Sequence, residues 1–92
     1  MPFITEETKR ELQERYSRGC EPVDLLRYLS SRGLTGGSLI LAMRDVFGLR
    51  LSEAIAIGGW RPDGTGELTD ERVNAHLGRG LREAVKRGLP SV

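Results

Sequence analysis

Apolar residues recur at helical spacing along most of the chain, and no segment alternates apolar and polar residues as a half-buried strand would. The pattern is strongest over residues 35–48, "TGGSLILAMRDVFG", where Gly48 is expected to end the helix. One wide face of this helix carries Leu39, Ile40, Met43, Val46 and Phe47. Leu41 and Ala42 widen that face, which predicts a helix covered on most of its sides.

Two helices are predicted before it, over residues 4–19 and 21–33. Thr5 is a typical N-cap residue for the first, and Pro22 suits the first position of the second. The apolar stripe of the first helix consists of Ile4, Leu12 and Tyr16. Because that stripe is narrow, the first helix should lie at the edge of the core. The inward face of the second consists of Leu25, Leu26 and Leu29.

A short fourth helix is predicted over residues 51–57, "LSEAIAI", with Ser52 as its cap. Gly48 can adopt the left-handed conformation that ends the preceding helix. Leu49 and Leu51 would then fold back onto the apolar face of that helix.

The last predicted helix opens at Thr69 and runs to about Arg87. Its apolar side consists of Val73, Leu77, Leu81, Ala84 and Val85. A chain of 92 residues has room for one hydrophobic core. We therefore expect an all-α fold, a single compact domain of about five helices over residues 1–92.

The segment "GGWRPDGTGELTDE", residues 58–71, carries the only tryptophan and a dense group of glycines and carboxylates. Pro62, Asp63 and Gly64 are typical turn residues, so a structured corner between two helices is expected. Trp60 could close the end of the helix bundle, or it could anchor a protein contact, since tryptophan supplies many interface hot spots. The candidate protein-binding residues of this corner are Trp60, Arg61, Asp63, Glu67, Asp70 and Glu71.

The middle of this segment is similar to the calcium loop of an EF-hand over residues 61–72. The matching positions are Asp63, Thr65, Gly66 and Leu68. The first and twelfth positions of such a loop supply carboxylates to the ion, and here they are the cations Arg61 and Arg72. We therefore predict no metal site, and calcium binding is the remotest of the alternatives.

Composition narrows the classes of function. The net charge of +1, from 14 basic and 13 acidic residues, argues against a surface that attracts nucleic acid or anionic lipid throughout. Cys20 is the only cysteine, so neither an internal disulfide nor a thiolate metal cage is expected. The longest apolar run, residues 39–43, is too short to cross a bilayer, and residues 1–16 lack the pattern of a signal peptide. We expect a cytoplasmic protein without a membrane segment.

The sequence offers no set of residues typical of catalysis. His76 is the only histidine, and nothing in the pattern pairs it with Cys20 as base and nucleophile. The carboxylates that could act as acid and base are Asp63, Glu67, Asp70 and Glu71. They are interpreted instead as a solvated turn and as acids that stabilise a helix N-terminus. No catalytic residue, no enzyme and no cofactor is predicted.

A basic strip is predicted beside the apolar face of the last helix, and it consists of Arg72, Arg79, Arg82 and Lys86. Four cations on one strip could neutralise phosphates, meet an acidic partner, or only keep the helix in water. Residues 25–45 also show the rhythm of a helix–turn–helix DNA reader. The second helix of that unit is too apolar to present polar groups to base edges.

Residues 39–54, "LILAMRDVFGLRLSEA", resemble the helix–turn–helix unit in the C-terminal domain of the bacterial ribosomal stalk protein. The matching positions are Ile40, Ala42, Arg44, Gly48, Leu49, Leu51, Glu53 and Ala54. The resemblance implies two helices joined at a glycine–leucine corner, packed on a three-stranded sheet and used to dock translation factors. Ile55 stands where that family usually carries a docking lysine.

By elimination, the sequence predicts a non-enzymatic module that binds another protein. A bacterial immunity or inhibitor protein that blocks a cognate partner is one such module. The alternative is a small nucleic-acid-binding protein that uses the basic strip. Homodimerisation stays open, because a second copy could cover the apolar helix at residues 35–48.

Overall fold

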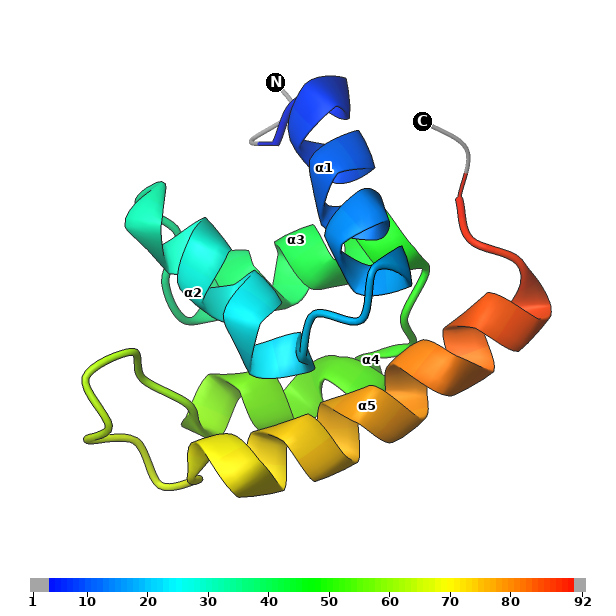
Figure 1. The fold of residues 1–92 in the computed structure, drawn as a ribbon. Coiled ribbons are helices and arrows are strands. Elements are labelled where there is room, and N and C mark those ends of the chain that lie inside the picture. Colours follow the sequence, from blue (N-terminus) through cyan, green and yellow to red (C-terminus); the bar gives the residue numbers. More distant parts are fainter. Residues whose placement is uncertain (1–3, 91–92) are drawn as a thin grey trace.

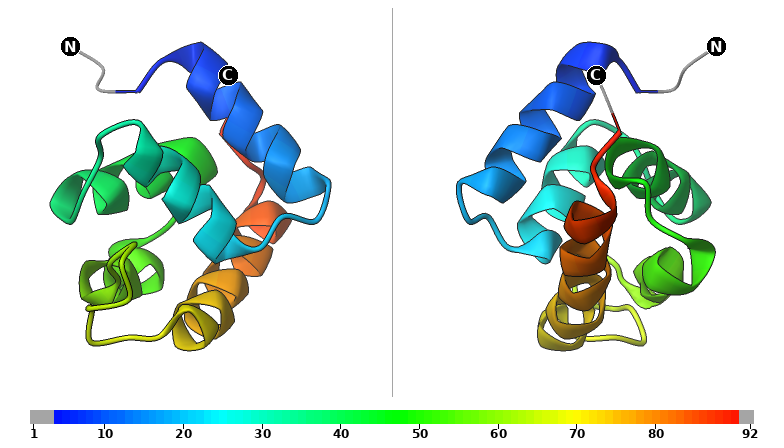
Figure 2. Two further views of the ribbon diagram at one scale, coloured as in Figure 1. Left: turned by 60° about the vertical axis from the view of Figure 1, so that its left-hand side comes forward. Right: turned by 90° about the vertical axis from the view of Figure 1, so that its right-hand side faces the viewer.

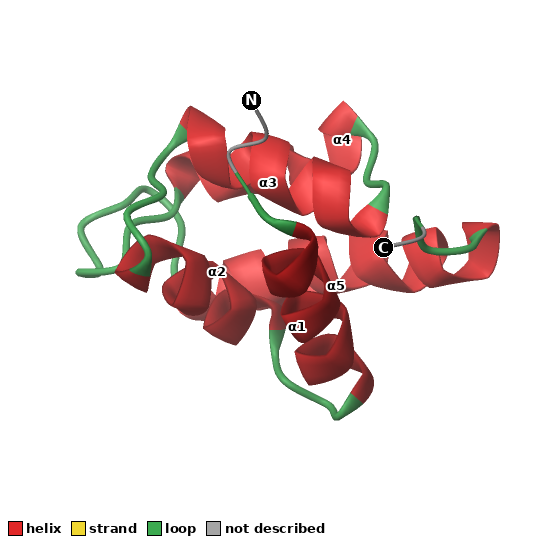
Figure 3. Ribbon diagram, turned by 90° about the horizontal axis from the view of Figure 1, so that it is seen from above, coloured by secondary structure: helices red, strands yellow, loops and turns green. Residues whose placement is uncertain are grey.

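The part of the chain that the computed structural model describes, residues 4–90, is built from helices and contains no strand (Figures 1 and 3). In chain order the elements are α1 (Glu6–Ser17), α2 (Pro22–Ser31), α3 (Gly37–Phe47), α4 (Leu51–Ala54), the 3-10 helix η1 (Ile55–Gly59) and α5 (Asp70–Arg87). The predicted all-α fold, a single small domain with five α-helices, is confirmed.

Short-range signals set the beginning of two helices. The hydroxyl of Thr5 accepts a hydrogen bond from the Thr8 amide (3.1 Å), and the hydroxyl of Thr69 accepts one from the Arg72 amide (3.2 Å). Both bonds satisfy an amide that has no partner inside its own helix, as expected of N-cap residues.

The start of α2 is capped from another element, which the sequence pattern did not reveal. Pro22 occupies the first helical position, as predicted, and Glu21 precedes it without a capping side-chain bond of its own. The side-chain oxygen of Asn74, on α5, accepts a hydrogen bond from the Val23 amide at 2.8 Å. The Asn74 amide group donates to the Glu21 carboxylate at 2.8 Å. Asn74 thus ties α5 to the beginning of α2.

The core is continuous and draws on every helix. Its buried apolar members are Ile4, Leu12, Val23, Leu25, Leu26, Leu29, Leu39, Ala42, Met43, Val46, Phe47, Leu49, Ala54, Ile57, Trp60, Val73, Leu77, Leu81 and Ala84. Figure 1 shows α5 along the lower side of the molecule, with α4 and η1 beside it and α1, α2 and α3 above. The right-hand view of Figure 2 looks nearly along α5, which packs against α2 on one side and α4 on the other.

Three side chains that were predicted to face the core are exposed instead. Leu41 is 54% exposed, Leu51 is 51% exposed and Val85 is 48% exposed. The prediction that α3 is covered on most sides is therefore wrong, because α1, α2, α4 and η1 leave the outer side of α3 open. Ala42 is buried, as expected.

The fourth helix differs from its prediction in both cap and length. Gly48 is left-handed (φ 68°, ψ 30°) and Leu49 is buried, as expected of this corner. Ser52 is not the cap, since the helix begins at Leu51 and its N-cap residue is Arg50. The Glu53 carboxylate reaches back and accepts a hydrogen bond from the Arg50 amide at 2.8 Å. Only one α-helical turn forms before the chain tightens into η1.

Two glycines of α5 lie where the helix approaches its neighbours most closely. A side chain at Gly80 would place Cβ 2.9 Å from the Cβ of Glu53, on α4. Carbon atoms do not approach so closely, so α4 can take this position only because residue 80 has no side chain. At Gly78 the nearest atoms to such a Cβ would be an Arg82 guanidinium nitrogen at 3.5 Å and a Pro22 ring carbon at 3.8 Å, which are ordinary contacts.

The two glycines therefore predict opposite effects of the same substitution. Gly80→Ala should lower the free energy of unfolding by about 1–3 kcal/mol, because α4 has to move away. Gly78→Ala should raise it by about 0.5–1 kcal/mol, because alanine is the better helix former and fits the space. Urea unfolding of both variants, followed by circular dichroism, measures this difference. Equal effects at the two positions would contradict the packing described for α5.

An ion pair closes the other end of the contact between α4 and α5. The Arg87 guanidinium donates to both carboxylate oxygens of Glu53, at 2.7 and 3.0 Å, and to the Gly48 carbonyl at 3.0 Å. These bonds from Arg87, together with the bond from the Arg50 amide, lower the pKa of Glu53 from 4.5 to about 2. One carboxylate thus caps α4 and holds the end of α5.

The lowered pKa of Glu53 predicts how the free energy of unfolding depends on pH. A depressed pKa stabilises the folded chain fully above about pH 4.5, and this contribution is lost as pH falls from there towards 2. Glu53→Gln should lower the urea midpoint at pH 7, and the gap between variant and parent should shrink below pH 4.5. Glu83→Gln is the control, since Glu83 is exposed and its ion pair with Lys86 is long (3.4 Å). A gap that is constant from pH 6 to 2 would contradict this role of Glu53.

Candidate functional site

The corner between η1 and α5 is held together from inside by its tryptophan. Trp60 is only 1% exposed, and its indole N–H donates to an Asp70 carboxylate oxygen at 2.8 Å. The Arg27 guanidinium, on α2, lies 5.6 Å from the centroid of the Trp60 ring and also donates to Asp70. The indole bond, followed by Arg27, lowers the pKa of Asp70. Trp60 therefore closes the end of the bundle, the first of the two roles predicted for it, and it does not lie at the surface with the other candidate protein-binding residues.

The rest of the corner is a closed turn. The Leu68 amide donates to the Gly59 carbonyl at 2.9 Å. Gly66 packs so tightly across the turn that a Cβ there would lie 2.4 Å from that same carbonyl oxygen. The Asp63 carboxylate accepts hydrogen bonds from the Thr65 hydroxyl (2.7 Å) and amide (3.0 Å), which lower the pKa of Asp63. The corner is thus a structured turn, in agreement with its glycines and Asp63.

The remaining candidates on this corner lie at the surface. Arg61, Asp63, Glu67 and Glu71 are exposed, whereas Asp70 is half-buried under the Arg27 guanidinium. Within residues 4–90, no group of three or more His, Cys, Asp or Glu side chains is arranged to hold a metal ion. What the corner offers is a rigid surface of mixed charge.

The basic strip lies on the face of α5 that points away from the core. Its four members, Arg72, Arg79, Arg82 and Lys86, are all exposed. At about 100° per residue they lie opposite Leu77 and Ala84, not beside the apolar face as expected. In the described part of the chain only Lys86 has an ion-pair partner, the exposed Glu83. The other three cations are available to an external anion.

An open apolar groove lies next to this strip. The Val85 groove, as we call it, is lined by Tyr16, Ser17, Gly19, Cys20, Glu21, Pro22, Arg82, Val85 and Lys86 and has a volume of about 700 Å³. One wall is the end of α1 and the turn into α2, and the other is one face of α5. Sequence reasoning missed this groove because its walls are separated along the chain by some sixty residues. Periodicity also assigned Val85 to the core, whereas the structure leaves it 48% exposed.

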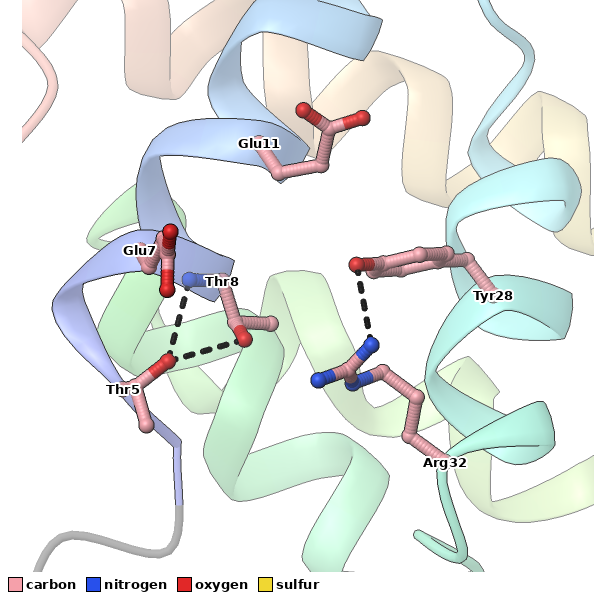
Figure 4. Close-up of a pocket in the computed structure, with 6 residues that line it drawn as sticks. All are labelled: Thr5, Glu7, Thr8, Glu11, Tyr28 and Arg32. Carbon is pink, nitrogen blue, oxygen red and sulfur yellow. Dashed lines mark hydrogen bonds between the residues drawn. The ribbon is translucent and has the colours of Figure 1, made fainter.

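A second cleft, between α1 and α2, is polar (Figure 4). It has a volume of about 400 Å³ and is lined by Thr5, Glu7, Thr8, Glu11, Tyr28 and Arg32. Many of its groups already bond to one another or to neighbours. The two threonine hydroxyls are 2.9 Å apart, the Glu11 carboxylate accepts from Arg15 at 2.8 Å, and an Arg32 nitrogen donates to the Tyr28 hydroxyl at 3.4 Å. The cleft combines both signs of charge and contains no nucleophile next to a base.

The structure does not bring the two residues considered for nucleophilic catalysis into contact. A ring nitrogen of His76 lies 3.3 Å from the Ser52 carbonyl, at the contact between α5 and α4. Cys20 is half-buried in the wall of the Val85 groove, which α5 shares with the α1–α2 turn.

No helix in the described part of the chain is long and apolar enough to cross a membrane.

The burial of Trp60 predicts a large structural role for it. Trp60→Ala should lower the free energy of unfolding by about 3–5 kcal/mol, because it opens a large cavity under the corner. Trp60→Phe should cost less, since it keeps an aromatic ring but leaves the Asp70 carboxylate without the indole donor. Arg61→Ala is the control at the exposed neighbour, with an expected change within about 0.5 kcal/mol. If urea unfolding showed Trp60→Ala to be as stable as the parent, the closing role of the indole would be wrong.

Comparisons of the chain with protein-family models, with curated proteins and with solved structures found no match. The local resemblance of residues 39–54 to the ribosomal stalk protein holds for the corner at Gly48. It fails for the surroundings that the resemblance implied, because residues 4–90 contain no strand on which the helix pair could pack. The site therefore has to be judged on its own geometry.

Proposed function

We propose that this protein is a non-enzymatic module that binds another protein, and that the Val85 groove is its main contact surface. The observation that carries the proposal is the apolar groove itself. Val85 stands 48% exposed in its wall, on a helix whose other large apolar residues, Val73, Leu77 and Leu81, are buried. Open, concave apolar surface rimmed by polar residues is typical of sites that receive a partner's side chains.

The way the aromatic side chains are packed favours a protein partner over single-stranded nucleic acid. Nucleic acid binding of that kind uses exposed aromatic faces on which bases stack. Among residues 4–90, Trp60 and Phe47 are buried, and the Tyr28 ring lies between the Arg15 and Arg32 guanidiniums, 4.4 and 5.5 Å from its centroid. Tyr16 is half-buried and packs edge-on against Phe47, with ring centroids 5.7 Å apart. No aromatic side chain in this part of the chain is fully exposed.

Nucleic acid is the second candidate, and one observation favours it. Arg72, Arg79 and Arg82 have no ion-pair partner within the described residues and share one face of α5. Such a strip could follow a phosphate backbone. In that case affinity would fall steeply with salt and would depend on all three arginines.

More specifically, we propose that the protein is a cytoplasmic inhibitor or immunity protein that blocks a cognate partner by binding to it. The small size of the domain and the lack of a catalytic arrangement among the described residues support this assignment. The corner could add a second contact through Arg61, Asp63, Glu67 and Glu71, which are exposed on a rigid turn. A second copy of the chain is an alternative partner for the exposed Leu51 and Ile55.

The test is affinity capture from a lysate of the source cell, with nuclease and with two matched variants. Val85→Asp puts a charge into the groove, and Ile55→Asp puts the same charge on the other exposed apolar position, which is 55% exposed. Both should fold, because exposed substitutions change stability little.

We expect the parent and Ile55→Asp to retain one stoichiometric protein after nuclease, and Val85→Asp to lose at least nine tenths of it. Capture that disappears with nuclease would favour the nucleic-acid candidate. Capture that survives Val85→Asp would move the contact surface away from the groove.

A further inference from the structure

We propose that the Val85 groove is specific for an acidic amphipathic segment of its partner, with apolar side chains in the groove and carboxylates on Arg82 and Lys86. This inference rests on the proposed function, since it names the chemistry of the partner at the same site. It depends on the charges around the groove, whereas the proposed function depends on its apolar wall.

The wall formed by α5 has a simple geometry. Arg82 precedes Val85 by three residues and Lys86 by four, so its side chain lies beside both of them on α5. Val85 and Lys86 are adjacent in the sequence and point about 100° apart around the helix. Arg82 folds back towards the α2 side, because one of its guanidinium nitrogens lies 3.5 Å from the Cβ position of Gly78, close to Pro22. An apolar side chain that contacts Val85 would therefore have the Arg82 cation beside it, with Lys86 further around the helix.

The opposite wall offsets only part of this positive charge. Glu21 is the only carboxylate among the lining residues, and its hydrogen bond from the neutral Asn74 amide leaves its negative charge in place. At the end of α1, the nearby Arg18 is paired with Glu14 at 3.2 Å. The two cations of the lining outnumber this one acid: Arg82 has no ion-pair partner among the described residues, and Lys86 is held only by a long, exposed bond to Glu83. Such a bond contributes little and can be exchanged for a partner's carboxylate.

The positive face continues beyond the groove. Arg79 and Arg72 lie on the exposed side of α5 further towards its start, so the strip from Arg72 to Lys86 extends for about 21 Å at 1.5 Å per residue. A partner segment that lies along α5 would meet four cations over this length, with the exposed Glu83 as the one acid on the same face. The same strip repels a basic segment. Of two partner segments with equal hydrophobicity, the groove would therefore bind the acidic one more tightly.

The experiment starts from random sequences and uses an uncharged groove variant, so that the selection itself does not favour acidic peptides. A phage-displayed library of random 16-residue peptides is selected on the immobilised protein and depleted on Val85→Ser. We expect the retained peptides to carry net negative charge and two or more large apolar residues. A synthetic copy of the most enriched peptide is then measured by fluorescence anisotropy.

Two variants of equal charge separate the proposed contact from a general effect of charge. Arg82→Glu/Lys86→Glu should weaken the peptide about tenfold or more, and a peptide with its acids replaced by lysine should bind this variant better than the parent. Arg10→Glu/Arg32→Glu changes net charge equally but alters no residue that lines the groove, and it should leave affinity within about twofold. Circular dichroism of both variants confirms that they fold.

The inference is overturned if the retained peptides are neutral or basic, if no Val85-dependent peptide is retained, or if both double variants weaken binding equally. Lysate capture separates that failure from failure of the proposed function. A partner protein lost from Val85→Asp but kept by Arg82→Glu/Lys86→Glu would leave the binding module standing and remove only its preference for acidic segments.

Discussion

The close approach of α5 to α2 and α4 is the constraint on which the rest of the structure depends. Among the described residues α5 is the longest helix, it lies between the two others, and the missing side chain of Gly80 leaves room for Glu53 on α4. The polar bonds that fix the arrangement sit at the same contacts. Asn74 caps α2, and Arg87 bonds the carboxylate of Glu53 that caps α4. Secondary structure and tertiary packing are thus stabilised by the same few side chains.

Local signals in the sequence were enough for the helices but not for their faces. Thr5, Thr69 and Gly48 act within a few residues of their own position, and each lies where the pattern placed it. The cap of α4 was misassigned because Glu53 is held in place by Arg87, a residue from the far end of the chain. Periodicity likewise gives the direction of an apolar stripe but not its cover, so the exposure of Leu41, Leu51 and Val85 could not be read from spacing.

The candidate site was even harder to predict from local sequence signals than the faces of the helices. The composition of the corner drew attention to Trp60, yet its burial depends on Arg27 and Asp70, which only the fold brings together. Four of the six corner candidates remain on the surface, and the basic strip remains exposed. The groove had no signal in any single segment, because its walls come from the α1–α2 turn and from α5. A site assembled from distant segments becomes visible only when the fold places them side by side.

The position of the groove follows from the packing of α5. Pro22 covers α5 at Gly78, where α2 begins, but α5 continues for another nine residues to Arg87. Tyr16 packs its ring against Phe47 and lines the groove together with Val85, which stays 48% exposed, so this turn of α5 has one side open. An apolar side chain left there would favour association with any apolar surface, and the nearby charges of Arg82 and Lys86 would restrict that choice. In the proposed contact, the same two cations that keep this exposed part of α5 hydrated would set the preference for an acidic segment of the partner.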